Sequence, residues 1–193
     1  MRPAYHQIEP DNWLEQAVTR NPKLPSGVSF LKGAFIADQI QEPLSFEVDF
    51  PSRDAVPHFI GNTIPVFSNE LVKGLAGAGV SNYQVFAAKL HSTITGEDWD
   101  GFWAFNVLGL VRAADRTRSE ADTLMEEDPD GSKPPLLAFN RLVLDSTKTG
   151  NQLMFRLAES PVVLLIHESV LSHLVDNPPP GRWRFDATRI ETS

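Results

Sequence analysis

The chain contains no cysteine, which excludes disulfides, thiolate catalysis and cysteine-bound zinc or iron–sulfur centres. It also lacks a long hydrophobic run. The longest apolar stretches, such as residues 161–166, are far shorter than the ~20 residues that a membrane-spanning helix needs. Residues 1–20 hold no apolar signal-peptide stretch. We therefore expect a soluble, cytoplasmic protein with no membrane partner.

Basic residues are scarce as well. The chain has 17 lysines and arginines against 25 acidic residues, which gives a net charge of −8. Sequence-independent nucleic-acid binding needs lysine and arginine to displace the counterions of the phosphates, so we expect no nucleic-acid partner. An acidic surface is instead suited to a basic protein partner.

No catalytic motif is present either: there is no GxSxG elbow, phosphate-binding loop or HExxH sequence. His167 and His173 are six positions apart, which on a helix turns them about 240° from each other, so they cannot share a metal ion. Gly74, Gly77 and Gly79 follow a helical pattern and favour a helix end over a dinucleotide site. We therefore predict no catalytic residue, no metal ion and no cofactor.

What the chain does contain is a series of short apolar segments with a fairly even spacing. Residues 44–50 alternate apolar and polar side chains, which predicts a half-exposed strand. Ser68 stands where a helix N-cap is expected, ahead of the apolar stripe of Leu71 and Leu75. Similar patterns predict further strands at 64–67, 83–90, 102–113, 139–145, 152–158 and 163–166, and a second helix after residue 167.

These segments predict an α+β fold with a mixed, largely antiparallel sheet and a few short helices, in a single domain of residues 1–193. Shifting residues 64–75 by 99 positions places their apolar residues on the apolar residues of 163–174. The shift favours two similar β-α-β units, although chance agreement is an open alternative. The expected core consists of Phe67, Leu71, Leu75, Val85, Phe105, Val107, Leu142, Leu144, Phe155, Leu165, Ile166 and Leu174.

Three segments have weaker signals. We expect residues 1–43 to be irregular, apart from a short helix from Asn12 to Arg20 that Asp11 caps. Ser119 and Asp122 resemble a capping box, which predicts a short polar helix in residues 119–130. Residues 183–185 are expected to form a strand.

Acidic residues gather in two places that are too polar for the core. One is the expected hairpin tip that carries Glu97, Asp98, Trp99 and Asp100, where Trp99 either contacts a partner or tucks under its own hairpin. The other contains Glu126, Glu127, Asp128 and Asp130, within a stretch, 119–130, of six acids and no base. Asp128 to Gly131 lacks the glutamate of a calcium-binding loop, so a solvated acidic loop is favoured. We predict that these eight residues bind a partner.

Four patterns carry a resemblance to a known family. They are the helix start Ser68-Asn69-Glu70-Leu71, the Gly101–Val111 strand with Asn106-Val107-Leu108, the turn from Asp115 to Ser119, and Leu142-Val143-Leu144-Asp145. Across residues 44–190 the chain resembles a bacterial family of polymorphic-toxin immunity proteins, of a myxobacterial type and formerly a domain of unknown function. It departs from the family in Pro178-Pro179-Pro180 and in its proline-rich beginning.

The resemblance implies a non-enzymatic inhibitor that binds and occludes a cognate toxin domain with a basic surface, possible toxins including nucleases. Two alternatives remain open from the residues themselves. One is a small cytoplasmic enzyme of unknown reaction that uses carboxylates with His58 or His167. The other is a general protein-interaction adaptor.

Overall fold

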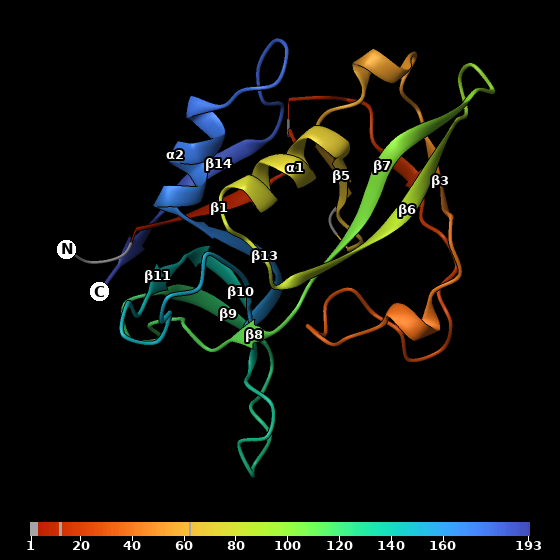
Figure 1. The fold of residues 1–193 in the computed structure, drawn as a ribbon. Helices are drawn as coiled ribbons and strands as arrows, with labels where there is room; N and C mark the ends of the chain where they lie inside the picture. The colour runs from red at the N-terminus through yellow and green to blue at the C-terminus, as the bar shows by residue number, and fades with distance from the viewer. Residues whose placement is uncertain (1–3, 12, 62) are drawn as a thin grey trace.

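The computed structural model describes residues 4–11, 13–61 and 63–193, and it shows an α+β fold built on two six-stranded sheets (Figure 1). The first sheet has the order β2-β3-β6-β7-β5-β4. Its strands are β2 (Val18–Arg20), β3 (Leu44–Val48), β4 (Phe59–Ile60), β5 (Val66–Ser68), β6 (Tyr83–Ser92) and β7 (Asp98–Val107). Most neighbouring strands are antiparallel, whereas β3 and β6 are parallel.

The second sheet has the order β11-β14-β1-β13-β12-β8. Its strands are β1 (Tyr5–Glu9), β8 (Leu110–Val111), β11 (Val143–Leu144), β12 (Met154–Leu157), β13 (Ser160–His167) and β14 (Asp186–Thr192). A separate pair is formed by β9 (Glu120–Met125) and β10 (Leu136–Arg141). The 3-10 turns η1 (Ala37–Gln39) and η2 (Arg53–Ala55) lie in the N-terminal third.

Two nine-residue helices begin where the sequence predicts. The Ser68 hydroxyl accepts a hydrogen bond from the Leu71 amide at the start of α1 (Asn69–Gly77), and Gly79 follows that helix with a φ of 89°. The His167 ring caps α2 (Glu168–Asp176) in the same way, through the Ser169 amide. Neither helix in the described part of the chain is long enough to cross a membrane.

The predicted β-α-β pair is present, in a split form. β5 and β6 flank the antiparallel strand β7 and are joined by α1, and β13 and β14 flank β1 and are joined by α2. The flanking strands correspond too: β4 is antiparallel to β5 as β12 is to β13, and β3 is parallel to β6 as β11 is to β14. We call each six-stranded sheet, together with its helix, one half of the protein. The halves differ in the middle strand of the unit, because β7 follows β6 directly in the chain whereas β1 lies near the N-terminus.

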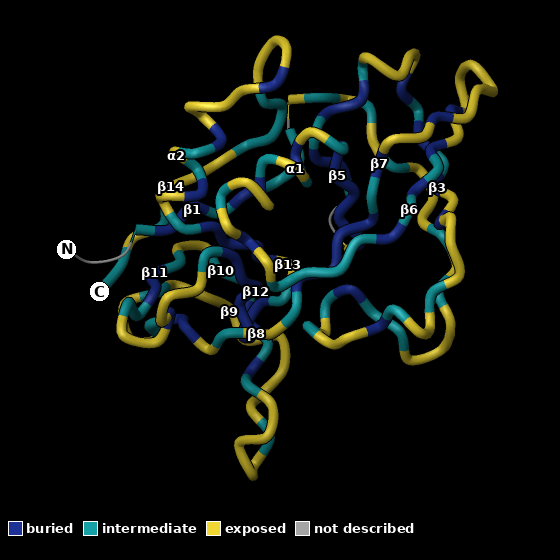
Figure 2. The backbone as a smooth tube through the Cα atoms, in the orientation of Figure 1, coloured by how far each residue is buried: buried dark blue, intermediate teal, exposed yellow. Residues whose placement is uncertain are grey.

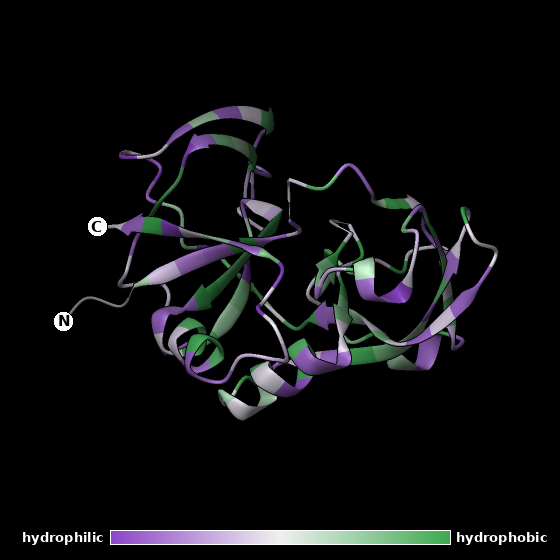
Figure 3. Ribbon diagram, turned by 90° about the horizontal axis from the view of Figure 1, so that it is seen from above, coloured by the Kyte–Doolittle hydropathy of each residue, from purple (hydrophilic) through white to green (hydrophobic). Residues whose placement is uncertain are grey.

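The halves join where the two helices pack side by side (Figure 3). Contact is close at Gly74, where an added Cβ would lie 2.6 Å from Leu174 Cδ2. The surrounding cluster takes residues from both sheets, among them Phe67, Phe105, Leu164 and Ile166. Two further clusters lie against the remaining faces of the two sheets. Ten of the twelve predicted core residues are buried, and Val85 and Leu142 are half-buried.

The three weaker predictions are wrong. Residues 5–9 form β1 near the centre of a sheet, so the N-terminal segment is not irregular throughout. Residues 18–20 form β2; Asp11 makes only a turn, accepting a bond from the Trp13 amide, and Asn12 lies outside the described residues. Residues 120–125 form β9 instead of a helix, and residues 183–185 lie just before β14.

Candidate functional site

The second acidic cluster lies on a two-stranded ribbon that projects from the body of the protein (Figure 1). We call β9, β10 and their connection, residues 126–135, the acidic ribbon. β10 packs on the body through Leu137, which is buried, whereas all six residues of β9 are exposed. Figure 2 shows most of the connection as exposed too. The ribbon therefore presents an outer strand that the fold does not cover.

β9 also has a free edge. In the described part of the chain its only strand partner is β10, so its other row of backbone amides and carbonyls faces solvent. Leu124 and Met125 at its end are 61% and 65% exposed. Natural proteins protect such edges because an unpaired strand readily pairs with another chain. The strand itself carries the charged residues Glu120 and Asp122.

The ribbon overhangs a groove of about 550 Å³ above the second sheet. Leu124, Leu137 and Phe139 line the groove from the ribbon, and Val163 and Ile190 line it from the sheet. The Arg141 guanidinium, paired with Glu191, stands at its rim. The groove thus adds apolar area directly beside the exposed end of β9.

The four predicted acids of the ribbon differ in their partners. Glu127 lies 3.4 Å from both Arg112 and Arg116, and Asp128 lies 3.4 Å from Lys133. Glu126 makes no ion pair with the described residues, and neither does Asp122 on β9.

Asp130 is held differently from these acids, by the amide of Ser132 at 2.9 Å. The Ser132 side chain lowers the pKa of Asp130 most, and the hydrogen bond from the Ser132 amide lowers it further. Asp130 is therefore charged at neutral pH. The acids of the ribbon that remain open to a partner are Asp122, Glu126 and Asp130.

The first acidic cluster lies at the tip of the β6–β7 hairpin, at the far end of the molecule from the ribbon in Figures 1 and 3. Trp99 is only 6% exposed and packs in the core of the first sheet, with its indole N–H bonded to Glu97 at 3.2 Å. Asp98 pairs with His91 at 2.9 Å and lies 3.8 Å from Lys89. Asp100 is exposed. The structure does not bring the two acidic clusters together, and it settles the open question of Trp99 in favour of burial.

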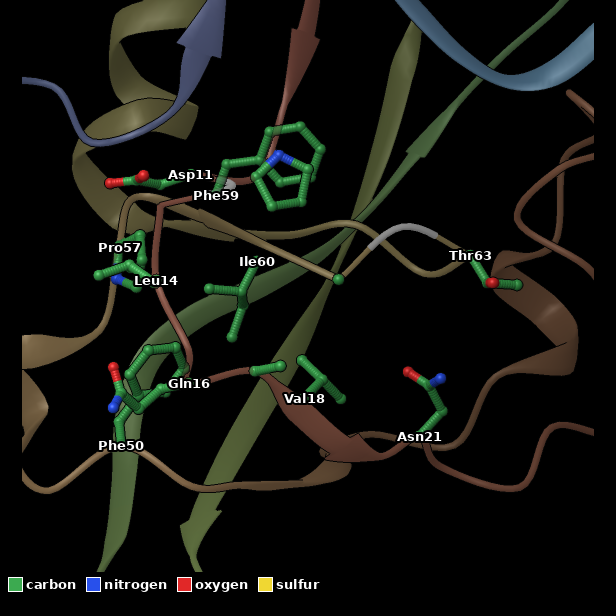
Figure 4. Close-up of a pocket in the computed structure, with 13 residues that line it drawn as sticks. Asp11, Leu14, Gln16, Val18, Asn21, Phe50, Pro57, Phe59, Ile60 and Thr63 are labelled. Atoms are coloured by element: carbon green, nitrogen blue, oxygen red, sulfur yellow. The ribbon is translucent and has the colours of Figure 1, made fainter.

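A cavity of about 360 Å³ is lined by described residues of segments 10–11, 14–21 and 57–61, together with Phe50 and Thr63 (Figure 4). Phe50, Phe59 and Ile60 supply much of its apolar wall. Among the described residues that line it, Asp11 alone is ionisable, so the cavity offers no pair of groups for acid–base chemistry.

The two histidines of the enzyme alternative both have structural partners. His167 caps α2, and its Nδ1 also lies 2.8 Å from the Ser169 hydroxyl. His58 accepts a hydrogen bond from the Arg184 amide at 3.1 Å, and its ring packs edge-on against Trp183. Burial lowers the pKa of His58, and Arg184 lowers it further, against the opposing charge of Glu70. His58 is therefore neutral at pH 7 in the folded protein.

This pKa shift predicts a pH dependence of stability. As the pH falls through 6.5, the ordinary value, the unfolded chain binds a proton at His58 before the folded protein does, so stability falls with it. The free energy of unfolding, measured by urea titration between about pH 7.5 and 5.5, should fall less steeply in His58→Gln than in the wild type. Parallel curves for the two proteins would contradict the assignment.

The β12–β13 hairpin buries two further ionisable groups. Arg156 is fully buried and donates from Nη1 to the Pro161 carbonyl at 2.7 Å, and burial lowers its pKa to about 10. Burial likewise raises the pKa of Glu159. The two side chains form no ion pair with described residues, and nothing in the sequence pattern marked them, because each stands within an apolar strand or a tight turn.

Comparison with known proteins adds no family to this picture. No family model matches the chain, and a search of curated proteins finds no significant match.

Proposed function

We propose that the chain is an immunity protein that binds and neutralises a cognate toxin domain by occlusion in the cytoplasm, with the acidic ribbon as its docking surface. The single observation that carries the proposal is the exposed free edge of β9. A strand that pairs on one side and is exposed throughout contributes little to the protein's own core. Such an edge suits the addition of a strand from a partner.

The side chains of the ribbon fit a protein partner. Two exposed side chains, Leu124, which lines the groove, and Met125, provide apolar anchors at the centre of the surface. Acids surround these anchors, as in interfaces that have an apolar centre and a charged rim. The exposed apolar pair therefore favours a protein partner over a small polar ligand, which would bind the acids alone.

The charge of the ribbon selects the partner. Asp122, Glu126 and Asp130 are free of ion pairs with described residues, and the whole chain has a net charge of −8. A partner with lysine and arginine at the matching positions is attracted over a distance of about 10 Å at 0.1 M salt. A toxin domain with a basic active-site surface has this property, and the ribbon would cover that surface.

The test is co-expression with the C-terminal domain encoded by the neighbouring gene, which the proposal expects to be the toxin. The wild type should restore growth and co-purify with the toxin. The double variant Asp122→Lys/Glu126→Lys should weaken binding at least about tenfold, because two attractive pairs become repulsive. It should keep the wild-type melting temperature, since neither acid has an intramolecular ion pair with described residues.

The matched control is Glu97→Lys/Asp100→Lys at the β6–β7 tip, which changes the net charge by the same amount. This control should bind within about twofold of the wild type, because the tip lies at the far end of the molecule from the acidic ribbon (Figures 1 and 3). Loss of binding in the tip variant alone would move the interface to that hairpin. A wild type that neither binds nor protects would overturn the immunity function itself.

A further inference from the structure

Three arginines line one cleft. The segments that carry them lie at the end of the molecule opposite the acidic connection of the ribbon (Figure 1). Arg53 comes from η2, and Arg182 and Arg184 come from the loop between α2 and β14. The first turn of α1 contributes Ser68 and Glu70, and His58 completes the polar wall. The cleft has a volume of about 460 Å³, which is the size of a small-molecule site.

Three of the five described arginines that lack a carboxylate partner meet in this cleft, the other two being Arg156 and Arg189. Five other arginines, Arg20, Arg112, Arg116, Arg118 and Arg141, each lie within 4.0 Å of a carboxylate. Within the part of the chain that the structure describes, Arg53, Arg182 and Arg184 form no such pair, although Asp54 and Glu70 line the same cleft. The cleft therefore gathers three guanidinium groups against two carboxylates, and none of these groups forms an ion pair with a described residue.

Two of the guanidinium groups are held in place by backbone carbonyls. Arg184 donates from Nη1 to the Asp54 carbonyl at 3.0 Å and from Nη2 to the Ala55 carbonyl at 2.5 Å. Arg53 donates from Nε and Nη2 to the Asp100 carbonyl at 3.4 and 3.3 Å, and it lies over the Phe102 ring. These bonds leave Arg53 Nη1 and Arg184 Nε as donors. Groups that are already ordered lose less entropy when they bind a ligand.

The remaining walls add further donors. His58 accepts the Arg184 amide at Nδ1, so its neutral ring carries the proton on Nε2. The N-terminus of α1 places the positive end of the helix dipole at the cleft. Arg182 makes no hydrogen bond with the described residues, so its whole guanidinium is available.

We propose that this cleft binds a small anion of the phosphate class, such as a phosphate monoester or a diphosphate. Guanidinium groups match the tetrahedral oxygens of phosphate through paired N–H donors. Asp54 and Glu70 oppose the anion and limit the affinity. This site is independent of the proposed toxin interface, and the failure of either leaves the other in place.

The experiment is a calorimetric titration of the full chain with pyrophosphate and with inorganic phosphate at low ionic strength. We expect saturable one-to-one binding that weakens with added salt. Arg182→Gln should weaken it about tenfold without affecting folding, because that side chain has no hydrogen bond with the described residues. Glu70→Gln should strengthen binding, since it removes the one opposing charge at the start of α1.

The control is Arg20→Gln, which removes an equal charge from a distant exposed ion pair with Glu47. It should leave pyrophosphate affinity unchanged. No saturable binding to the wild type would overturn the proposal, as would equal losses in Arg182→Gln and Arg20→Gln, which would indicate a response to net charge only. A Glu70→Gln variant that binds more weakly than the wild type would also contradict it.

Discussion

Replacing Leu75 by alanine is expected to lower the free energy of unfolding by about 2–5 kcal/mol, and Leu174→Ala by a similar amount. Both side chains are fully buried in the cluster that joins the two halves, and they occupy corresponding positions 99 residues apart, one on each helix. Each truncation leaves a cavity between elements of both halves. The measurement is equilibrium unfolding in urea at constant pH.

The control for this pair is Val175→Ala, next to Leu174 on the same helix but 63% exposed. It should change stability by no more than about 0.5 kcal/mol. A loss below about 1 kcal/mol at Leu75 or Leu174 would remove that residue from the shared core. A transition that splits into two steps in either variant would show that the halves unfold separately.

Gly33→Ala is the second change with a large expected effect. Gly33 has a φ of 62°, and an added Cβ would lie 2.7 Å from the carbonyl carbon of Gly109 and 2.9 Å from its oxygen. Both atoms belong to the backbone, and the Gly33 carbonyl also accepts a hydrogen bond from the Gly109 amide at 2.8 Å. Conformational strain and overpacking together should cost about 2–5 kcal/mol.

Gly27→Ala separates the two causes, because Gly27 has a φ of 83° but no atom within 4 Å of an added Cβ. It should cost only about 1–2 kcal/mol, the strain of the left-handed conformation. Equal losses at Gly27 and Gly33 would show that the approach to Gly109 does not contribute. Melting temperatures of the two variants, measured side by side, make the comparison.

Local patterns identified several elements in the middle of the chain, although the strand predicted at 102–113 is divided between β7, which ends at Val107, and β8 in the second sheet. The alternation of residues 44–50 predicts β3, whose burial alternates as expected, and the cap at Ser68 marks the start of α1 within one residue. The 99-residue shift anticipated the repeated topology, although not its split form. These predictions succeeded because the local preference of each segment agrees with the contacts that the segment makes in the folded protein.

The same reasoning failed where the partner of a segment lies far along the chain. β1 pairs with β13 and β14, about 160 and 180 residues later in the sequence, and no pattern within residues 5–9 shows that they will meet. Ser119 resembles a helix cap, yet its hydroxyl bonds to both the amide and the carbonyl of Val143 on β11. Pairing of β9 with β10 then outweighs a helix that would have had no apolar face to bury.

For the acidic clusters, too, the sequence shows some properties and the tertiary structure decides others. Their charge and their exclusion from the core are visible in the sequence, because charged residues stay in water wherever the chain folds. The sequence left the position of Trp99 open, and only packing against the first sheet decided that it is buried. Ion pairing likewise depends on the fold: Arg112 and Arg116 reach Glu127, whereas Asp122 and Glu126 keep their charge free of ion pairs with described residues.

The sequence by itself determined the composition class, the α+β alternation, most of the core and the location of surplus negative charge. These properties follow from hydrophobicity, charge and short-range periodicity, which each segment carries with it. Only the tertiary structure decided that an N-terminal strand completes the second half, that β9 keeps a free edge, and that Arg53, Arg182 and Arg184 share one cleft. Each of these depends on contacts between segments distant in the chain, whose formation is set by the packing of the whole molecule and leaves no local pattern.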